Sequence, residues 1–274
     1  MLRVHKPSFP LNQFVENLVY YDEPGILHNL DRFLPDGNTE IIIDLAEKSQ
    51  YIYDNETLQK IQICRNAWVS GVRTRPITIP SGKGSRMLIV AFKKGKAFPF
   101  YRFPMNKLTD MVAGADLAFG RKFHDLRHQL LAVKSADRMF ELVETFLLRQ
   151  AGDEIREDSS TRCIEYALFT IIHKPTLRCL QQLSEEIGYS QKHLIHLFRE
   201  QVGVTPKQYL RIMRFQKAIC TIERGQFRRW SQIALKSGYY DQAHFINDFK
   251  HFSGFTPSEY MKRKSPILNY IPVG

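Results

Sequence analysis

Apolar positions in the last third of the chain recur with helical spacing, and the same arrangement occurs twice. The first copy predicts a short helix that ends at Gly188 and a second helix that begins after Ser190, a residue well suited to cap a helix. The apolar faces of the two helices are Leu180, Leu183 and Ile187, then Leu194, Leu197 and Phe198. We therefore expect two amphipathic helices joined by a tight turn.

The second copy follows about fifty residues later. Gly238 ends its first helix and Asp241 is the expected cap of its second. Its apolar faces are Ile233 and Ala234, then Phe245 and Phe249. Two short helices joined by a glycine-containing turn are typical of the helix-turn-helix motif, whose second helix can enter the major groove of DNA.

The two copies also share single residues at fixed spacings. These are Gly188-Tyr189, Phe198, Gly203, Thr205-Pro206 and Tyr209 in the first copy, and Gly238-Tyr239, Phe249, Gly254, Thr256-Pro257 and Tyr260 in the second. With His244-Phe245, Lys250 and Ser258-Glu259, this pattern resembles the paired helix-turn-helix region of the AraC/XylS transcription regulators, over roughly the last hundred residues. The resemblance implies a sequence-specific DNA-binding regulator, an activator more often than a repressor. Its partners would be double-stranded DNA, RNA polymerase and a second copy of the chain.

The first hundred residues have a different pattern, in which short β-branched runs alternate with turn signals. The runs predict strands over Glu40–Leu45, Gln50–Tyr53, Gln62–Ser70, Pro76–Ile79 and Arg86–Phe92. From about Asn106 the period becomes helical, which predicts helices over Met105–Val112, Asp116–Val133 and Ser135–Gln150. Strands at such short intervals favour a small β-barrel or sandwich.

The expected fold class is therefore a multidomain chain of α and β structure. A small β-barrel, cupin-like domain with trailing helices precedes an all-α domain of two helix-turn-helix units joined by a linker helix. The expected divisions are a sensing or dimerisation domain over 1–150 (strands 1–105, helices 106–150), a charged linker over 151–160, a DNA-binding domain over 161–264 and a tail over 265–274. The N-terminal half is also similar to sensing domains of AraC-type regulators. Leu34-Pro35-Asp36-Gly37 and Thr74-Arg75-Pro76 resemble one uncharacterised subgroup of them, which brings no known ligand.

Charge is concentrated on the repeat. The chain has a net charge of +11, and the segment Thr161–Lys264 holds 17 Lys and Arg against 8 Asp and Glu. A basic half joined to a nearly neutral half favours a polyanion-binding module beside a domain of another kind.

Side chains on the outer faces of the two second helices are the candidates for reading bases. They are Gln191, Lys192, Ile195 and His196 in the first unit, and Gln242, Ala243, Ile246 and Asn247 in the second. Arg199, Arg228, Arg229 and Lys250 are the candidates for phosphate contacts. Arg211, Arg214 and Lys217, on the expected connecting helix, should face solvent or phosphate.

The chain departs from the family pattern at several of these positions. Arg is common where His196 and Asn247 stand, and small polar residues are common where Ile195 and Ile246 stand. Asp248 replaces a small apolar residue beside the packing face. Because of these departures, we do not transfer to this chain the DNA sequences that other members of the family bind.

The sequence gives weaker indications of an effector pocket and of a metal site. An effector pocket in the barrel could be lined by Tyr51, Tyr53, Trp68, Arg73 and Arg75, although aromatic residues on strands are more often plain core. His124 and His128 have a metal-binding spacing but lack the Glu of HExxH and a nearby third ligand, so we expect no metal and no cofactor.

The four cysteines, at positions 64, 163, 179 and 220, form no CxxC pair, which argues against a disulfide framework. No run of apolar residues approaches the ~20 needed to span a membrane, so a cytoplasmic, non-membrane protein is expected.

Three hypotheses about function remain open at this point. The first is a regulator whose N-terminal half binds a small effector, dimerises or does both. The second is a regulator that binds no ligand and uses its N-terminal half only for dimerisation and polymerase contact. The third is a DNA-alkyl repair enzyme with Cys64 as the acceptor thiol, which would require an activated thiolate. We expect a protein that is not an enzyme.

Overall fold

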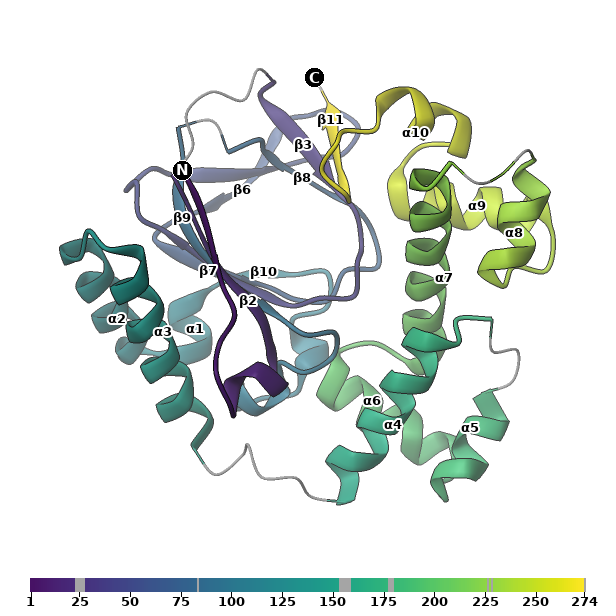
Figure 1. Ribbon diagram of the computed structural model, residues 1–274, viewed down its shortest axis with the longest axis horizontal. Coiled ribbons are helices and arrows are strands. Elements are labelled where there is room, and N and C mark those ends of the chain that lie inside the picture. The colour runs from purple at the N-terminus through teal and green to yellow at the C-terminus, as the bar shows by residue number, and fades with distance from the viewer. Residues whose placement is uncertain are drawn as a thin grey trace.

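A computed structural model describes residues 1–22, 28–82, 84–152, 159–176, 180–225, 227 and 229–273. Figure 1 shows a β-rich N-terminal part, with the helices of residues 115–151 along one side of it and the helices of the C-terminal part on the opposite side. This arrangement confirms the predicted fold class. No helix in the described ranges is long and apolar enough to cross a membrane.

Eleven strands form two antiparallel sheets in the described part of the N-terminal domain and the C-terminal tail. The six-stranded sheet has the order β1 (Leu2–His5), β2 (Val15–Asp22), β9 (Arg86–Phe92), β4 (Glu40–Asp44), β7 (Ala67–Ser70) and β10 (Val112–Gly114). The five-stranded sheet has the order β11 (Tyr270–Val273), β3 (Leu30–Phe33), β8 (Ile77–Pro80), β5 (Gln50–Tyr53) and β6 (Lys60–Cys64). A small core lies between the sheets and contains Ile52, Cys64, Ile77 and Val112, with Trp68 packed against it.

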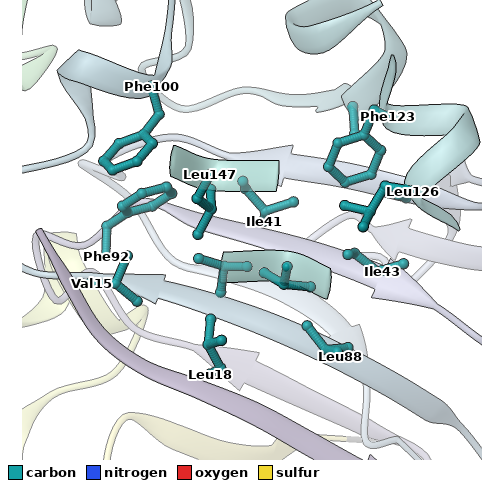
Figure 2. Close-up of a cluster of buried hydrophobic side chains, with 14 of the residues drawn as sticks. Val15, Leu18, Ile41, Ile43, Leu88, Phe92, Phe100, Phe123, Leu126 and Leu147 are labelled. Carbon is teal, nitrogen blue, oxygen red and sulfur yellow. The ribbon is translucent and has the colours of Figure 1, made fainter. Parts of the chain in front are cut away.

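The larger core of this domain lies between the six-stranded sheet and three helices. These helices are α1 (Ala115–Phe119), α2 (Arg121–Ala132) and α3 (Ala136–Ala151), and the 3₁₀ turns are η1 (Leu11–Gln13), η2 (Phe98–Phe100) and η3 (Met105–Lys107). Figure 2 shows Ile41 of the sheet beside Leu147 of α3, and Ile43 beside Leu126 of α2. Alternate strand residues therefore face the helices, as a half-buried sheet requires.

Three of the predicted elements are wrong in detail. The strand predicted over Gln62–Ser70 is two strands, because the chain turns at Asn66, whose φ is 61°. The helix predicted over Met105–Val112 is one 3₁₀ turn followed by β10, and Asp110, with a φ of 57°, interrupts the helical path. The helix predicted over Asp116–Val133 is divided into α1 and α2 at Gly120, whose φ is 65°.

The C-terminal domain consists of seven helices in the described residues. They are α4 (Ser159–His173), α5 (Leu180–Ile187), α6 (Gln191–Val202), α7 (Pro206–Glu223), α8 (Trp230–Ser237), α9 (Gln242–Ser253) and α10 (Pro257–Arg263). Helices α5 and α6 form the first helix-turn-helix unit and α8 and α9 form the second, while α7 connects them (Figure 1). Most of the predicted linker, residues 153–158, lies outside the described residues.

The sequence repeat is also a structural repeat. Ser190 accepts a hydrogen bond from the backbone N of His193, and Asp241 accepts the same bond from His244. Thr205 with Gln208, and Thr256 with Glu259, form capping boxes at the starts of α7 and α10. Each unit therefore begins its second helix, and the helix that follows it, in the same way.

Candidate nucleic-acid interface

Helices α6 and α9 each bury one face and expose the other. Leu194, Leu197 and Phe198 of α6 are buried, as are Phe245 and Phe249 of α9. The aromatic contact that closes each unit is repeated, since Phe198 packs edge-on against Tyr209 and Phe249 against Tyr260, with ring centroids 5.7 and 5.4 Å apart. The buried faces fix the roll of each helix, so the opposite faces are directed outward.

Most of the side chains predicted to read bases lie on those outward faces. Gln191, Lys192, His196, Gln242, Ala243 and Asn247 are exposed, and Ile195 is 39% exposed. Ile246 differs, because it is half-buried and packs against the core of the domain. Its side chain is therefore less available for contact with a thymine methyl group than that of Ile195.

The residues predicted to contact phosphate have mixed positions. Arg199 and Lys250 are exposed, one turn beyond the base-reading positions of their helices. Arg229 is exposed and precedes α8 as its N-cap residue. Arg228 lies outside the described residues. Three of the four predicted cations are thus presented at the surface of the helical domain.

The connecting helix sets how far apart the two units lie. Helix α7 has 18 residues, which corresponds to a length of about 27 Å at ~1.5 Å per residue. Figure 1 shows α6 toward one end of α7 and α9 beside the other. Two helices reading successive major grooves on one side of B-DNA must be ~34 Å apart. A rigid connector of this length is suited to that requirement.

Asp248, which has no obvious role in the sequence, forms a buried link between α9 and α7. Its carboxylate accepts hydrogen bonds from Arg211 Nη2 at 2.7 Å and Arg211 Nε at 3.3 Å. These bonds raise the pKa of Arg211. His244 Nε2 lies 3.7 Å from the same carboxylate. Asp248 therefore holds α9 on the connector α7.

The expectation that the connector residues Arg211 and Arg214 face solvent or phosphate is wrong, because both side chains have partners within the helical domain. Arg211 is engaged by Asp248 and also lies over the ring of Phe252 at 5.4 Å. Arg214 donates from Nε to the carbonyl oxygen of Pro175 at 2.9 Å. Both side chains join parts of the helical domain to one another.

The five residues proposed for an effector pocket are not brought together. Tyr51 and Tyr53 alternate on β5 with Ile52, which faces the core between the sheets, so they point to the opposite side. Trp68 packs into that core, while Arg75 is exposed on a loop. Strand alternation therefore separates residues that are close in sequence.

Arg73 has an unusual environment within this set. Its Nη2 donates to the carbonyl oxygen of Asp110 at 3.3 Å, while its buried Nε and Nη1 have no hydrogen-bond partner. Burial lowers the pKa of this guanidinium. Asp110 also accepts hydrogen bonds from Thr74 through its N and Oγ1, so the contacts here stabilise a loop.

A cavity of about 350 Å³ lies elsewhere, between α2 and α3. Leu126 and Phe146 line it together with polar and charged side chains, which include Lys122 and Arg149. This volume is within the range of small-molecule sites. No feature of the sequence distinguished these positions, because they lie on two helices whose packing geometry is set by the tertiary fold.

The structure also describes the candidate metal and thiol chemistry. His124 and His128 contact each other edge-on with ring centroids 4.5 Å apart, and no group of three or more possible metal ligands occurs in the described residues. Cys64 is buried, and burial raises the pKa of its thiol to about 11. An acceptor thiol needs the opposite shift, so this environment disfavours the DNA-alkyl repair hypothesis.

Comparisons with known proteins match the two parts of the chain separately. Residues 183–263 match a helix-turn-helix domain family, and residues 3–113 match a domain of unknown function, DUF6597. An uncharacterised HTH-type transcriptional regulator of Haemophilus influenzae is 32% identical over 100 residues, which are 36% of this chain and 33% of that protein. The HTH-type transcriptional activator RhaR of Yersinia pseudotuberculosis is 38% identical over 80 residues, which are 28% of this chain and 27% of that protein. The chain thus spans a third or less of the length of these curated relatives.

Among solved structures, ToxT from Vibrio cholerae is similar with a TM-score of 0.46 and 12% identity, covering 89% of this chain and 97% of that one. The C-terminal domain of the response regulator yesN from Fusobacterium nucleatum is similar with a TM-score of 0.35 and 26% identity, covering 36% and 98% of the two chains.

Proposed function

We propose a function for this chain as a regulator of the AraC/XylS type. Its paired helix-turn-helix domain and its regulator relatives place it in that family. The chain binds double-stranded DNA in a sequence-specific way, with α6 and α9 in two successive major-groove segments. The relatives are regulators, in agreement with the expectation that the protein is not an enzyme.

One observation carries this proposal. Helices α6 and α9 have caps of the same kind, equivalent buried aromatic contacts and mostly polar exposed faces, and they are held at the two ends of one connector. Gln242 and Asn247 offer paired hydrogen bonds to adenine, while Lys192 offers a donor to guanine. The exposed Arg199, Arg229 and Lys250 supply charge for the phosphates that flank each groove.

Selection from random duplexes with the full chain tests the proposal. We expect a recovered site with two conserved segments whose centres are about one helical turn, ~10 bp, apart. Mobility shift against that site and a scrambled duplex should then show a specific affinity that falls with salt. Recovery of no preferred sequence, or of a single segment, would contradict the two-groove arrangement.

The N-terminal domain, in this proposal, controls how DNA-binding domains are presented. It binds a small effector, forms a homodimer or does both, and the complex activates transcription through contact with RNA polymerase. The hollow between α2 and α3 is a candidate place for that effector in this proposal. The competing view is a regulator that binds no ligand and uses this domain for association alone.

Ligand binding separates these two views. A ligand of the folded state raises the thermal midpoint by mass action, so a metabolite library screened by thermal shift should yield at least one hit. Thr145→Trp places a large side chain at the exposed rim of the α2–α3 cavity and should remove that shift. A hit that persists in this variant would place the ligand elsewhere, and a library without hits would favour the ligand-independent regulator.

A further inference from the structure

The C-terminal tail returns from the DNA-binding domain to the sheet of the N-terminal domain. Strand β11 pairs with β3 along its whole length, with Tyr270 opposite Phe33 and Val273 opposite Leu30. Ile271 of this strand is fully buried and belongs to the core of the helical domain. The last strand of the chain is therefore shared between the two domains.

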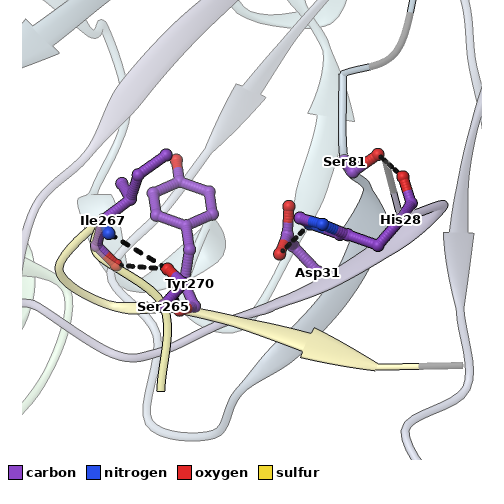
Figure 3. Close-up of polar contacts among 6 residues, drawn as sticks. All are labelled: His28, Asp31, Ser81, Ser265, Ile267 and Tyr270. Atoms are coloured by element: carbon purple, nitrogen blue, oxygen red, sulfur yellow. Dashed lines mark hydrogen bonds and ion pairs between the residues drawn. The ribbon is translucent and has the colours of Figure 1, made fainter. Parts of the chain in front are cut away.

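Both strands of this pair are anchored by local polar contacts (Figure 3). Ser265 Oγ lies 3.0 Å from the carbonyl oxygen of Ile267 and 2.9 Å from that of Tyr270, which sets the turn that leads into β11. At the start of β3, His28 Nε2 lies 2.9 Å from Asp31 Oδ1, and Ser81 Oγ donates to the carbonyl oxygen of His28. The pairing thus joins two segments that are each held in place.

Strand β3 also contacts the second helix-turn-helix unit directly. The guanidinium of Arg32 lies 4.8 Å from the ring centroid of Phe255, in the turn between α9 and α10, and Arg263 lies 5.2 Å from the same ring. A Cβ at Gly254 would be 2.5 Å from Arg32 Nη1, which shows how closely the turn and the strand approach. The second unit is consequently attached to the N-terminal domain through both β11 and Arg32.

The first unit and the connector are attached to the same domain at other points. Thr109 donates from Oγ1 to the carbonyl oxygen of Gly203, just after α6, at 2.6 Å. Tyr209 of α7 donates to the carbonyl oxygen of Gly37 at 3.1 Å. Gln216 donates from Nε2 to the carbonyl oxygen of Pro35 at 2.7 Å and to Asn269 Oδ1 at 3.0 Å. The N-terminal domain therefore touches both helix-turn-helix units and the helix between them.

These attachments leave the outward faces of α6 and α9 exposed, so they do not mask the surface that would meet DNA. Their effect is on geometry, because the two units are connected twice: once through α7 and once through the N-terminal domain. The second attachment adds to the contacts between α7 and α9, so the closed frame resists tilting of the second unit more than α7 alone does.

Resting on the proposed function, we propose that β11 is a brace that fixes the position of α9 relative to α6 and so selects the spacing between the two halves of the DNA site. Residues that hold the brace, Ile271 and Arg32 above all, are positioning residues for recognition although they touch no base. When β11 is released, the protein should accept DNA sites with a wider range of spacings. Binding at the optimal spacing should weaken, because the position of α9 relative to α6 must then be fixed at the moment of binding.

Duplexes that carry the selected site with its spacer lengthened or shortened by single base pairs test the brace in the full chain. Ile271→Asp places a carboxylate at a fully buried position and should release β11, while Ile267→Asp makes the same change at a position of the tail that is 60% exposed. Wild type and Ile267→Asp should show one sharp optimum. Ile271→Asp should bind about fivefold more weakly at that optimum and lose little further affinity at neighbouring spacings.

A chain that ends at Lys264 provides a second variant with no buried charge, and circular dichroism with hydrogen exchange of α9 and α10 shows that each variant keeps its helices. The truncated chain should have the same flattened spacing profile as Ile271→Asp. If both variants keep the sharp wild-type profile, the brace does not set the spacing and the inference is wrong. If the wild type itself prefers no sequence, the proposed function fails and the inference fails with it.

Discussion

Arg211 on α7 and Asp248 on α9 form a two-point ion pair, with Nη2 and Nε of the arginine 2.7 and 3.3 Å from the two carboxylate oxygens. The two residues are 37 positions apart, and the Asp248 side chain is only 8% exposed. The contact fastens α9 to the connector near the middle of α9. It accounts for an acidic residue in a domain that is otherwise rich in positive charge.

Removing one partner of this pair should destabilise the helical domain. Asp248→Ala leaves the Arg211 guanidinium without its acceptor, and we expect a loss of about 2 kcal/mol in the free energy of unfolding, as for other charge-assisted hydrogen bonds. Arg211→Leu should have an effect of similar size. The double variant should lose clearly less than the sum of the single losses, since both act on one contact. Urea unfolding measures all three, and strict additivity would show that the pair contributes nothing.

The outward faces of α6 and α9 predict two different kinds of DNA-binding defect. Gln242→Ala with Asn247→Ala should reduce the preference for the selected site over a scrambled one, by ~1–3 kcal/mol for each paired hydrogen bond lost. The affinity for scrambled DNA should hardly change. Mobility shift on both duplexes measures the difference, and equal losses on the two would mean that these side chains do not read bases.

Lys250→Ala should act on affinity rather than preference. It should weaken binding to all duplexes alike and lower the slope of log affinity against log salt by about 1. Lys134→Ala makes the same charge change at an exposed position before α3, away from both reading helices, and serves as the control. A salt slope that is unchanged in Lys250→Ala but lowered in Lys134→Ala would show that the phosphate contact is made by the N-terminal domain and not by α9.

Local patterns were sufficient to predict the repeat, because its determinants lie within a few residues of one another. Ser190 and Asp241 cap the helices that they were expected to cap, and the apolar spacings define the buried faces. The roles of Asp248 and Arg211 were not predictable in the same way. Their partners lie on different helices, so their spacing in the sequence carries no sign of the contact.

Long-range pairing also explains what was missed in the sheets. Nothing in Tyr270-Ile271-Pro272-Val273 distinguishes a strand from an extended tail, and its partner β3 lies more than two hundred residues earlier. The five residues suggested for an effector pocket are separated for a related reason. Tyr51 and Trp68 are aromatic residues on strands, but strand alternation and sheet packing decide which side of a sheet each one faces.

The junction between the domains should make stability depend on pH through Glu40. Burial, with the nearby negative charge of Asp36, raises the pKa of Glu40 to about 8, while the ordinary value of 4.5 applies in the unfolded chain. Tyr270 of β11 lies near both carboxyl groups, and Lys94 lies near Asp36, donating to its carbonyl oxygen at 2.5 Å. Burial also raises the pKa of Asp36 itself.

Because the folded chain holds this proton more tightly than the unfolded chain, the stabilisation is complete below about pH 4.5 and is lost as the pH rises through 8. The slope contributed by Glu40 should reach at most ~1.4 kcal/mol per pH unit in that window. Glu40→Gln should flatten the dependence and raise the stability at pH 8, whereas Glu16→Gln, at an exposed position of β2, should do neither. Urea unfolding from pH 5 to 9 measures this, and a wild-type stability that rises across the window would refute the assignment.

Gly37 lies where the N-terminal domain contacts the connector α7, and its replacement should loosen the two domains. Its φ is 84°, and a Cβ there would lie 2.7 Å from Met213 Cε and 3.1 Å from Tyr209 Oη. Gly120 has a similar backbone, with a φ of 65°, but open space around its Cβ position. Gly120→Ala should therefore lose only the ~1 kcal/mol of stability that the left-handed conformation costs an alanine, and Gly37→Ala should lose that and the contact with α7 as well.

Hydrogen exchange should show faster opening of α7 in Gly37→Ala alone, since the displaced Tyr209 would no longer donate to the Gly37 carbonyl oxygen. Equal losses in both variants, with α7 equally protected, would mean that this contact contributes no stability and that the domains are held together by the tail and the first unit.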